Sequence, residues 1–101
     1  MDEHYKEVRH HAADYENQIK NLLDDKSDPI GRGLLEKSRL LVSEVEAKRK
    51  PRQLENRIKE ILHLLHEAKE MGEAIMDQRH ISFLHHSYEH LGLQLRKFDN
   101  Y

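Results

Sequence analysis

Residues 81–98 have the sequence ISFLHHSYEHLGLQLRKF, in which apolar side chains recur at alternating steps of three and four positions. Since an α-helix has about 3.6 residues per turn, this spacing lines one face of a helix with apolar groups. The segment is therefore predicted to be a helix that packs against other helices. The repeating positions are Ile81, Leu84, Tyr88, Leu91, Leu95 and Phe98.

Three earlier segments show the same spacing. The first has Tyr5, Val8, Ala12, Tyr15, Ile19 and Leu22; the second has Ile30, Leu34, Leu41 and Val45, widened by Leu35 and Val42; the third has Leu54, Ile58, Ile61, Leu65, Ala68 and Ile75, widened by Leu62, Leu64 and Met71. The chain is rich in Leu, Glu, Lys and Arg and has no Thr or Trp, a composition that favours helix over strand. We expect an all-α protein with a single domain over residues 1–101, folded as an antiparallel up-down bundle of four helices.

Two prolines mark helix boundaries. Pro29 suits the first turn of the second helix, where its missing N–H costs nothing, and Ser27 or Asp28 can cap that helix. The second helix is predicted to run to about Lys50, because Pro51 disfavours helical geometry at the residue before it. Residues 48–52 are then a short basic turn.

The boundary between the last two helices has two interpretations. The apolar stripe of the fourth segment is out of phase with the third by one residue, which predicts a break between Gly72 and His80 with Asp77 as a cap. The alternative is one continuous helix from about residue 52 to 98. The chain would then be a three-helix protein with one overlong arm.

Composition and charge exclude several classes of protein. There is no Cys, so disulfides and thiolate chemistry are absent, and no apolar run approaches the roughly 20 residues that span a bilayer. The formal net charge of −2 gives no general attraction to nucleic acid or acidic membranes. The polar, acidic stretch Met1–Tyr5 is unlike a signal peptide. We expect a cytoplasmic, intracellular protein without membrane association.

Charge is also unevenly distributed along the chain. Residues 1–28 carry four basic and eight acidic side chains, whereas residues 29–58 carry eight basic and four acidic ones. Opposite charges favour packing of these two segments side by side.

The nine histidines raise the question of a metal site. Glu7 with His10, and Glu60 with His63, match the Glu-x-x-His spacing of di-metal helical bundles. All four fall on outward positions relative to the apolar stripes, so we predict no buried metal centre and no cofactor. The weaker surface candidates for a transition metal are His86 and His90, which lie one helical turn apart.

One constellation resembles a known family. Arg79 and His80, followed by His86, Ser87 and Tyr88, resemble the Arg-x4–6-His motif of the HEPN superfamily of small helical ribonucleases. The resemblance implies that Arg79 and His86 act on RNA across a dimer cleft, with Tyr88 in support. An arginine can hold a phosphate through two hydrogen bonds, and a histidine can transfer protons near neutral pH.

Neither a nucleophile in an activating context nor a phosphate-binding loop occurs in the sequence. The leading hypothesis is a non-enzymatic helical module that binds another protein or itself. The alternative is a dimeric HEPN-like ribonuclease with Arg79, His86 and Tyr88 as its catalytic residues. Only this alternative implies a nucleic-acid partner.

Overall fold

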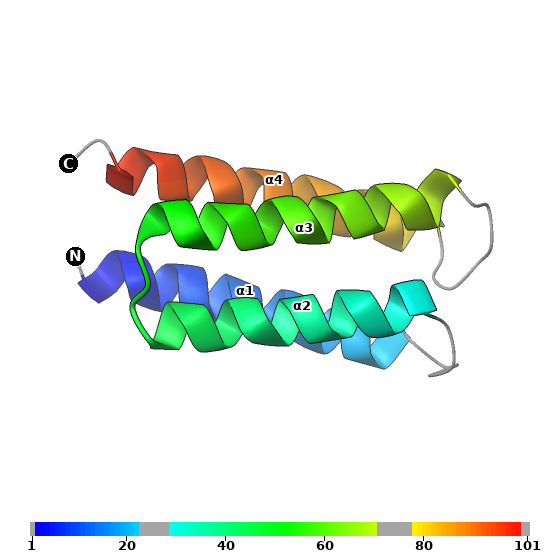
Figure 1. Ribbon diagram of the computed structural model, residues 1–101, viewed down its shortest axis with the longest axis horizontal. Helices are drawn as coiled ribbons and strands as arrows, with labels where there is room; N and C mark the ends of the chain where they lie inside the picture. The colour runs from blue at the N-terminus through cyan, green and yellow to red at the C-terminus, as the bar shows by residue number, and fades with distance from the viewer. Residues whose placement is uncertain (1, 23–28, 71–77, 100–101) are drawn as a thin grey trace.

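The computed structural model describes residues 2–22, 29–70 and 78–99, all but a short loop of which is helical. The elements are α1 (Asp2–Leu22), α2 (Pro29–Glu46), α3 (Pro51–Glu70) and α4 (Gln78–Asp99). Each helix runs antiparallel to the one before it along a molecule of 41 × 20 × 18 Å (Figure 1). The predicted all-α, four-helix up-down bundle is confirmed.

The alternative of one continuous helix over residues 52–98 is wrong. α3 ends at Glu70, α4 begins at Gln78, and the two helices pack side by side in opposite directions (Figure 1). The caps predicted at Ser27, Asp28 and Asp77 lie outside the described residues.

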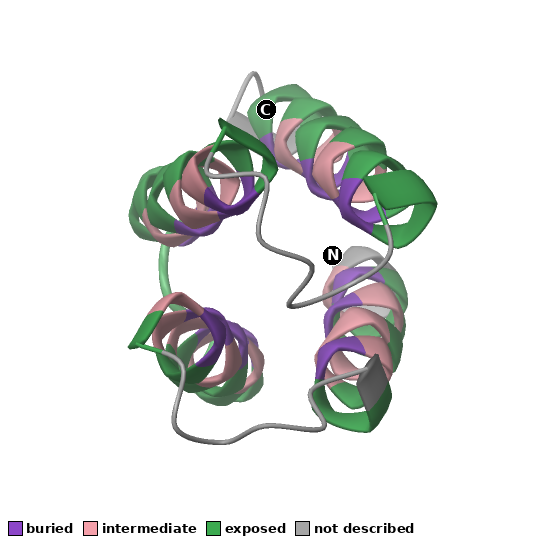
Figure 2. Cartoon of the chain, turned by 90° about the vertical axis from the view of Figure 1, so that its right-hand side faces the viewer, coloured by how far each residue is buried: buried purple, intermediate pink, exposed green. Residues whose placement is uncertain are grey.

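The core lies where the four apolar stripes meet in the middle of the bundle (Figure 2). Half-buried side chains such as Tyr15 and Leu62 pack around the buried set. The side chains of Leu22, Met71, Ile75 and Phe98 lie outside the described set. The predicted stripe positions are otherwise confirmed as the source of the core, whose buried apolar members are Val8, Ala12, Ile19, Leu34, Leu41, Val45, Leu54, Ile58, Ile61, Leu65, Ala68, Ile81, Leu84, Tyr88, Leu91 and Leu95.

Two core positions of α2 are occupied by small residues rather than large apolar ones. Gly31 and Ser38 are buried and continue the stripe formed by Leu34 and Leu41. The Ser38 hydroxyl donates a hydrogen bond of 2.8 Å to the carbonyl of Leu35, one turn earlier. A buried hydroxyl needs such a partner, so this bond lets a polar side chain fill a core position.

Replacing Leu65 with Ala is expected to lower the free energy of unfolding by about 2–5 kcal/mol, because its fully buried side chain would leave a cavity. Urea titration followed by circular dichroism measures this loss. The half-exposed Leu93 is the matched control, and its replacement by Ala should change the free energy by about 0.5 kcal/mol or less. Equal losses at the two positions would contradict the assigned core.

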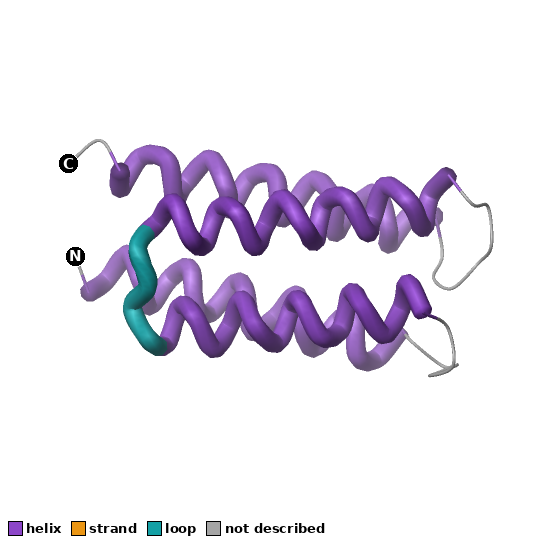
Figure 3. The backbone as a smooth tube through the Cα atoms, viewed as in Figure 1, coloured by secondary structure: helices purple, strands orange, loops and turns teal. Residues whose placement is uncertain are grey.

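The loop between α2 and α3 differs from its prediction (Figure 3). α2 ends at Glu46 instead of near Lys50. Lys48 has a φ of 55°, in the left-handed region that side-chain-bearing residues rarely adopt. The helix therefore ends before the proline exerts any effect, through a local backbone structure that no sequence motif announced.

Hydrogen bonds define this helix end as a Schellman motif. The amide of Lys48 donates to the carbonyl of Val45 at 3.0 Å, and the amide of Arg49 donates to that of Glu44 at 3.1 Å. The Tyr5 hydroxyl of α1 donates to the Arg49 carbonyl at 3.0 Å. These contacts fix the loop against the first helix.

Changing Lys48 to Gly is expected to stabilise the protein by about 1 kcal/mol, because glycine adopts a positive φ without steric cost. The midpoint of urea unfolding measures the gain. Lys48→Ala is the control, since it removes the same charge but keeps the Cβ. If the glycine variant is no more stable than the alanine variant, the left-handed conformation at this position is not costly.

Ion pairs join each helix to the next at the edges of the core. α1 and α2 are linked by Arg39 with Glu16, at 3.4 Å, in the sense that the net charges of the two segments predict, and by Arg9 with Glu46, at 3.0 Å, in the opposite sense. α3 and α4 are linked by Arg96 with Glu55, at 2.6 Å. Such half-exposed pairs each contribute little stability, but they favour this neighbour order over others.

Candidate functional site

The outer face of α4 carries a second regular stripe of residues. Its members follow one another at steps of four, three, four, three and four, and all are exposed; they are Arg79, Phe83, His86, His90, Leu93 and Lys97, and we call this set the outer stripe. At about 100° per residue, the set spans an arc of roughly 80° on the side of α4 opposite the core. The buried residues of α4 face inward, away from it (Figure 2).

Two large apolar side chains in the outer stripe are half in solvent. Phe83 is 54% exposed and Leu93 is 53% exposed, and they are ten positions apart on the same helix. Leu40 on α2, at 37%, is the other large apolar residue counted as exposed in the described part of the chain. Since buried residues already provide the inner face of α4, the fold gives no reason for Phe83 and Leu93 to be apolar.

The outer stripe contains no carboxylate. Arg79 and Lys97 are at its two ends, and the imidazoles of His86 and His90 are between them. The nearby Glu89 lies on the flank of the helix, where its carboxylate is 2.9 Å from the Nδ1 atom of His85. The face is therefore apolar and histidine-rich in its middle and basic at its ends.

Some of the other histidines differ from His86 and His90 in having an acidic partner. Four histidines lie one turn from a glutamate partner: His11 with Glu7, His63 with Glu67, His66 with Glu70, and His85 with Glu89. Over residues 2–22, 29–70 and 78–99, the structure shows no ion pair or hydrogen bond for His86 or His90. Their imidazole nitrogens are thus open to solvent and to ligands.

The two Glu-x-x-His pairs do not form a common site. Glu7 and His10 are exposed on α1, and Glu60 and His63 are exposed on α3. Lys37 lies 3.1 Å from the Glu60 carboxylate, so that group already has a cationic partner. Within the described ranges, no three His, Asp or Glu side chains come close enough to hold a metal ion.

The electrostatics of Glu60 follow from its neighbours. The hydrogen bond from Lys37 lowers the pKa of Glu60 below its ordinary value, and Arg57, at 2.8 Å, lowers the pKa further. A lowered carboxyl pKa means that folding favours the ionised form.

Glu60→Gln is expected to destabilise the protein at neutral pH by less than about 1 kcal/mol, because the Glu60 side chain is nearly half exposed and solvent screens its ion pairs with Lys37 and Arg57. The contribution of the ionised Glu60 to the free energy of unfolding is fully present above the ordinary pKa of a glutamate. It is lost as the pH falls through the lowered pKa that Glu60 has in the folded protein. The difference between wild type and variant should therefore vanish in acid. Thermal melts over a pH series measure this difference in stability, and Glu36→Gln, at an exposed glutamate of α2, is the control. A difference that persists in acid would contradict the electrostatic cause.

The structure separates the residues of the Arg-x4–6-His motif. Arg79 and His86 are both exposed on the outer stripe, about 10 Å apart along the helix axis. Tyr88 points the other way and is fully buried, with its ring centroid 5.2 Å from that of Tyr15. Burial raises the pKa of Tyr88 strongly. Its phenol cannot reach a phosphate that lies beside Arg79 and His86.

The hydroxyl of Tyr88 has no hydrogen-bond partner among the described residues. An unpaired buried hydroxyl costs free energy, so Tyr88→Phe is expected to leave the free energy of unfolding unchanged or raise it by up to about 1 kcal/mol. Tyr88→Leu is the contrasting variant, since it also removes the ring contact with Tyr15 and should destabilise. Denaturant unfolding compares them. Marked destabilisation by Tyr88→Phe would show that the hydroxyl has a partner.

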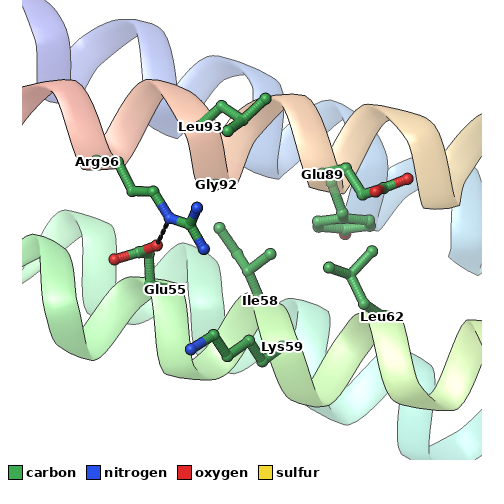
Figure 4. Close-up of a pocket in the computed structure, with 9 residues that line it drawn as sticks. Glu55, Ile58, Lys59, Leu62, Glu89, Gly92, Leu93 and Arg96 are labelled. Carbon is green, nitrogen blue, oxygen red and sulfur yellow. Dashed lines mark hydrogen bonds and ion pairs between the residues drawn. The ribbon is translucent and has the colours of Figure 1, made fainter.

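A shallow groove of about 210 Å³ runs between α3 and α4, beside the outer stripe (Figure 4). Gly92 lines it, and a Cβ at this position would make ordinary van der Waals contact with the Cγ2 atom of Ile58, at 3.8 Å. The ion pair of Arg96 with Glu55 lies at one end, and Leu93 lies on the rim. The groove is smaller than the roughly 300–1,000 Å³ of small-molecule sites. It instead extends the apolar surface around Leu93.

Comparison of the chain with protein-family models, with curated proteins and with solved structures finds no match. None of the helices, over the residues that the structure describes, has the length and apolar character needed to cross a membrane.

The outer stripe as a whole was not predicted from the sequence, although the sequence indicated three of its members, Arg79, His86 and His90, as candidate site residues. The spacing that reveals it is present in the sequence. The stripe is hard to recognise in the sequence because only two of its six positions are strongly apolar.

Proposed function

We propose that this bundle is a non-enzymatic, intracellular module that binds another protein chain through the outer stripe of α4. The observation that carries the proposal is the half-exposure of Phe83 and Leu93 on the side opposite the core. Large apolar side chains in the middle of a face with polar ends are typical of protein interfaces. Binding would remove them from water without disturbing the bundle.

Position-specific cross-linking in cells tests this proposal. A photoreactive phenylalanine analogue at position 83 is expected to form a covalent adduct with a protein, and Leu93→Gln should reduce that adduct. The matched control places the analogue at position 40, the other exposed apolar position. Absence of an adduct specific to position 83 would rule out the proposed face.

A second candidate function is the HEPN-like ribonuclease. It is supported by the common exposure of Arg79 and His86 on one face of α4. Cleavage of single-stranded RNA that is lost in both Arg79→Ala and His86→Ala, but kept in Tyr88→Phe, would establish this activity. Equal cleavage by the wild type and both alanine variants would eliminate it.

A further inference from the structure

We propose that His86 and His90 form half of a zinc site that a second copy of this chain completes. In this dimer the outer stripes of two α4 helices pack antiparallel, and four imidazoles hold one Zn²⁺ ion. The inference rests on the proposed function, because it uses the same face, and it names the partner and the ligand.

The ligand spacing comes directly from the helix. His86 and His90 are one turn apart on one face, the spacing at which helical histidine pairs bind zinc. They are the one such pair among the nine histidines, since no other two are separated by four positions. Both are exposed, and no glutamate engages either one in the described part of the chain. The pair is thus ready to chelate.

One chain cannot complete the site. Structural zinc takes four protein ligands in a tetrahedron, and His86 with His90 supplies two. On α3, His66 and Lys69 line a second hollow, which His86 also lines and which is separate from the groove at Gly92, but His66 lies 3.8 Å from its own partner Glu70. The missing ligands must therefore come from another molecule, and a second copy offers an identical pair.

The order of residues in the outer stripe is symmetric about position 88. Going outward from that position, His86 matches His90, Phe83 matches Leu93, and Arg79 matches Lys97. In an antiparallel pair of helices with a two-fold axis at this position, His86 faces the partner's His90 and Phe83 packs on the partner's Leu93. A patch that complements itself in this way is what a two-fold interface requires.

The size of the contact explains why a metal is needed. α4 has 22 residues and is about 33 Å long, so a strip one helix wide, about 10 Å, covers roughly 330 Å² on each copy. A standard interface buries about 800 Å² on each partner. In addition, Arg79 faces the partner's Lys97 at both ends, and like charges oppose pairing. Apolar contact alone gives a weak dimer, and zinc coordination supplies the missing free energy.

The apolar members of the stripe have a defined place in this site. Phe83 and the partner's Leu93 lie on either side of the four imidazoles and shield them from water. A dry surrounding shell strengthens metal coordination. The proposal thus accounts for the apolar and the histidine residues of the outer stripe together.

Sedimentation equilibrium of the tag-free protein with Zn²⁺ tests the inference. The chain of 12.1 kDa is expected to be a monomer in EDTA and a dimer with zinc, at one ion per two chains. His86→Gln and His90→Gln should each weaken zinc binding by about tenfold or more, since each removes two of the four ligands in the dimer. His63→Gln, at an exposed histidine of α3, is the matched control. Circular dichroism verifies that the variants fold.

The orientation of the two copies has its own test. Because the chain has no Cys, a nitroxide label on Arg79→Cys is unique. In the antiparallel dimer the two labelled positions are separated by about 27 Å along the helix axis, whereas a parallel dimer would bring them together. Electron paramagnetic resonance measures the distance between the two labels in the presence of zinc and so distinguishes the two arrangements.

Three results would overturn the inference. They are one zinc ion per chain without dimerisation, zinc binding that His86→Gln leaves unchanged, and a dimer that persists in EDTA. A dimer that persists in EDTA overturns the zinc site but agrees with the proposed function, because the face still binds a protein. The proposed function itself fails on the separate observation that position 83 forms no adduct.

Discussion

Each helix of this protein buries about one apolar side chain per turn, along a single narrow face. The bundle depends on the contact between these four faces. With 37% apolar residues in 101, there is little apolar surface to spare. The heptad-like spacing places the buried part of it in one column along the bundle axis. A small domain of this kind buries a modest fraction of its surface, so a gap in one stripe cannot be offset elsewhere.

Because the core uses only the inner face of each helix, the apolar residues in the outer stripe of α4 are not explained by the fold. Apolar side chains that point away from the core add little to the stability of the fold, and a large exposed apolar patch increases the risk of aggregation. On α1 and α3 the outer positions are filled with charged and polar residues, among them Glu7, Asp14, Asn56 and Lys59. Phe83 and Leu93 depart from this pattern on α4, and Leu40 is the single large apolar residue among the described ones that does so on α2. The departure coincides with the histidine pair and with the absence of carboxylates, and these three features together define a surface with its own chemistry.

Most of the fold could be predicted from the sequence, because helical periodicity is a local property that the chain displays directly. The stripes predicted the helical segments, their facing sides and the burial of residues such as Leu65 and Tyr88, and they favoured four helices over the three of a continuous last helix. Two kinds of detail were not accessible. The buried Ser38 depends on a hydrogen bond to its own helix, and the early end of α2 depends on a left-handed Lys48, where glycine would have been expected.

The candidate site was predictable only in part for a related reason. Spacing places Arg79 and His86 on one face, but it does not show that Tyr88, two positions after His86, points to the opposite side with its hydroxyl enclosed. Residues that are close in sequence on a helix diverge in direction by about 100° for each step. A motif match over neighbouring positions therefore does not establish a shared site.

The ends of the chain and the α2–α3 loop divide the molecule into two halves. The start of α1, the end of α4 and the α2–α3 loop all lie at the same end of the bundle (Figure 1). The molecule is thus two helical hairpins joined by residues 47–50. Contact between the hairpins is mainly that of α2 with α3, the two helices that this loop joins. A circular permutant that joins the two ends and opens the chain in this loop would keep the sequence of every helix intact but disturb the loop that the Tyr5 hydroxyl holds, so its stability would show how far the pairing of the hairpins relies on their order along the chain.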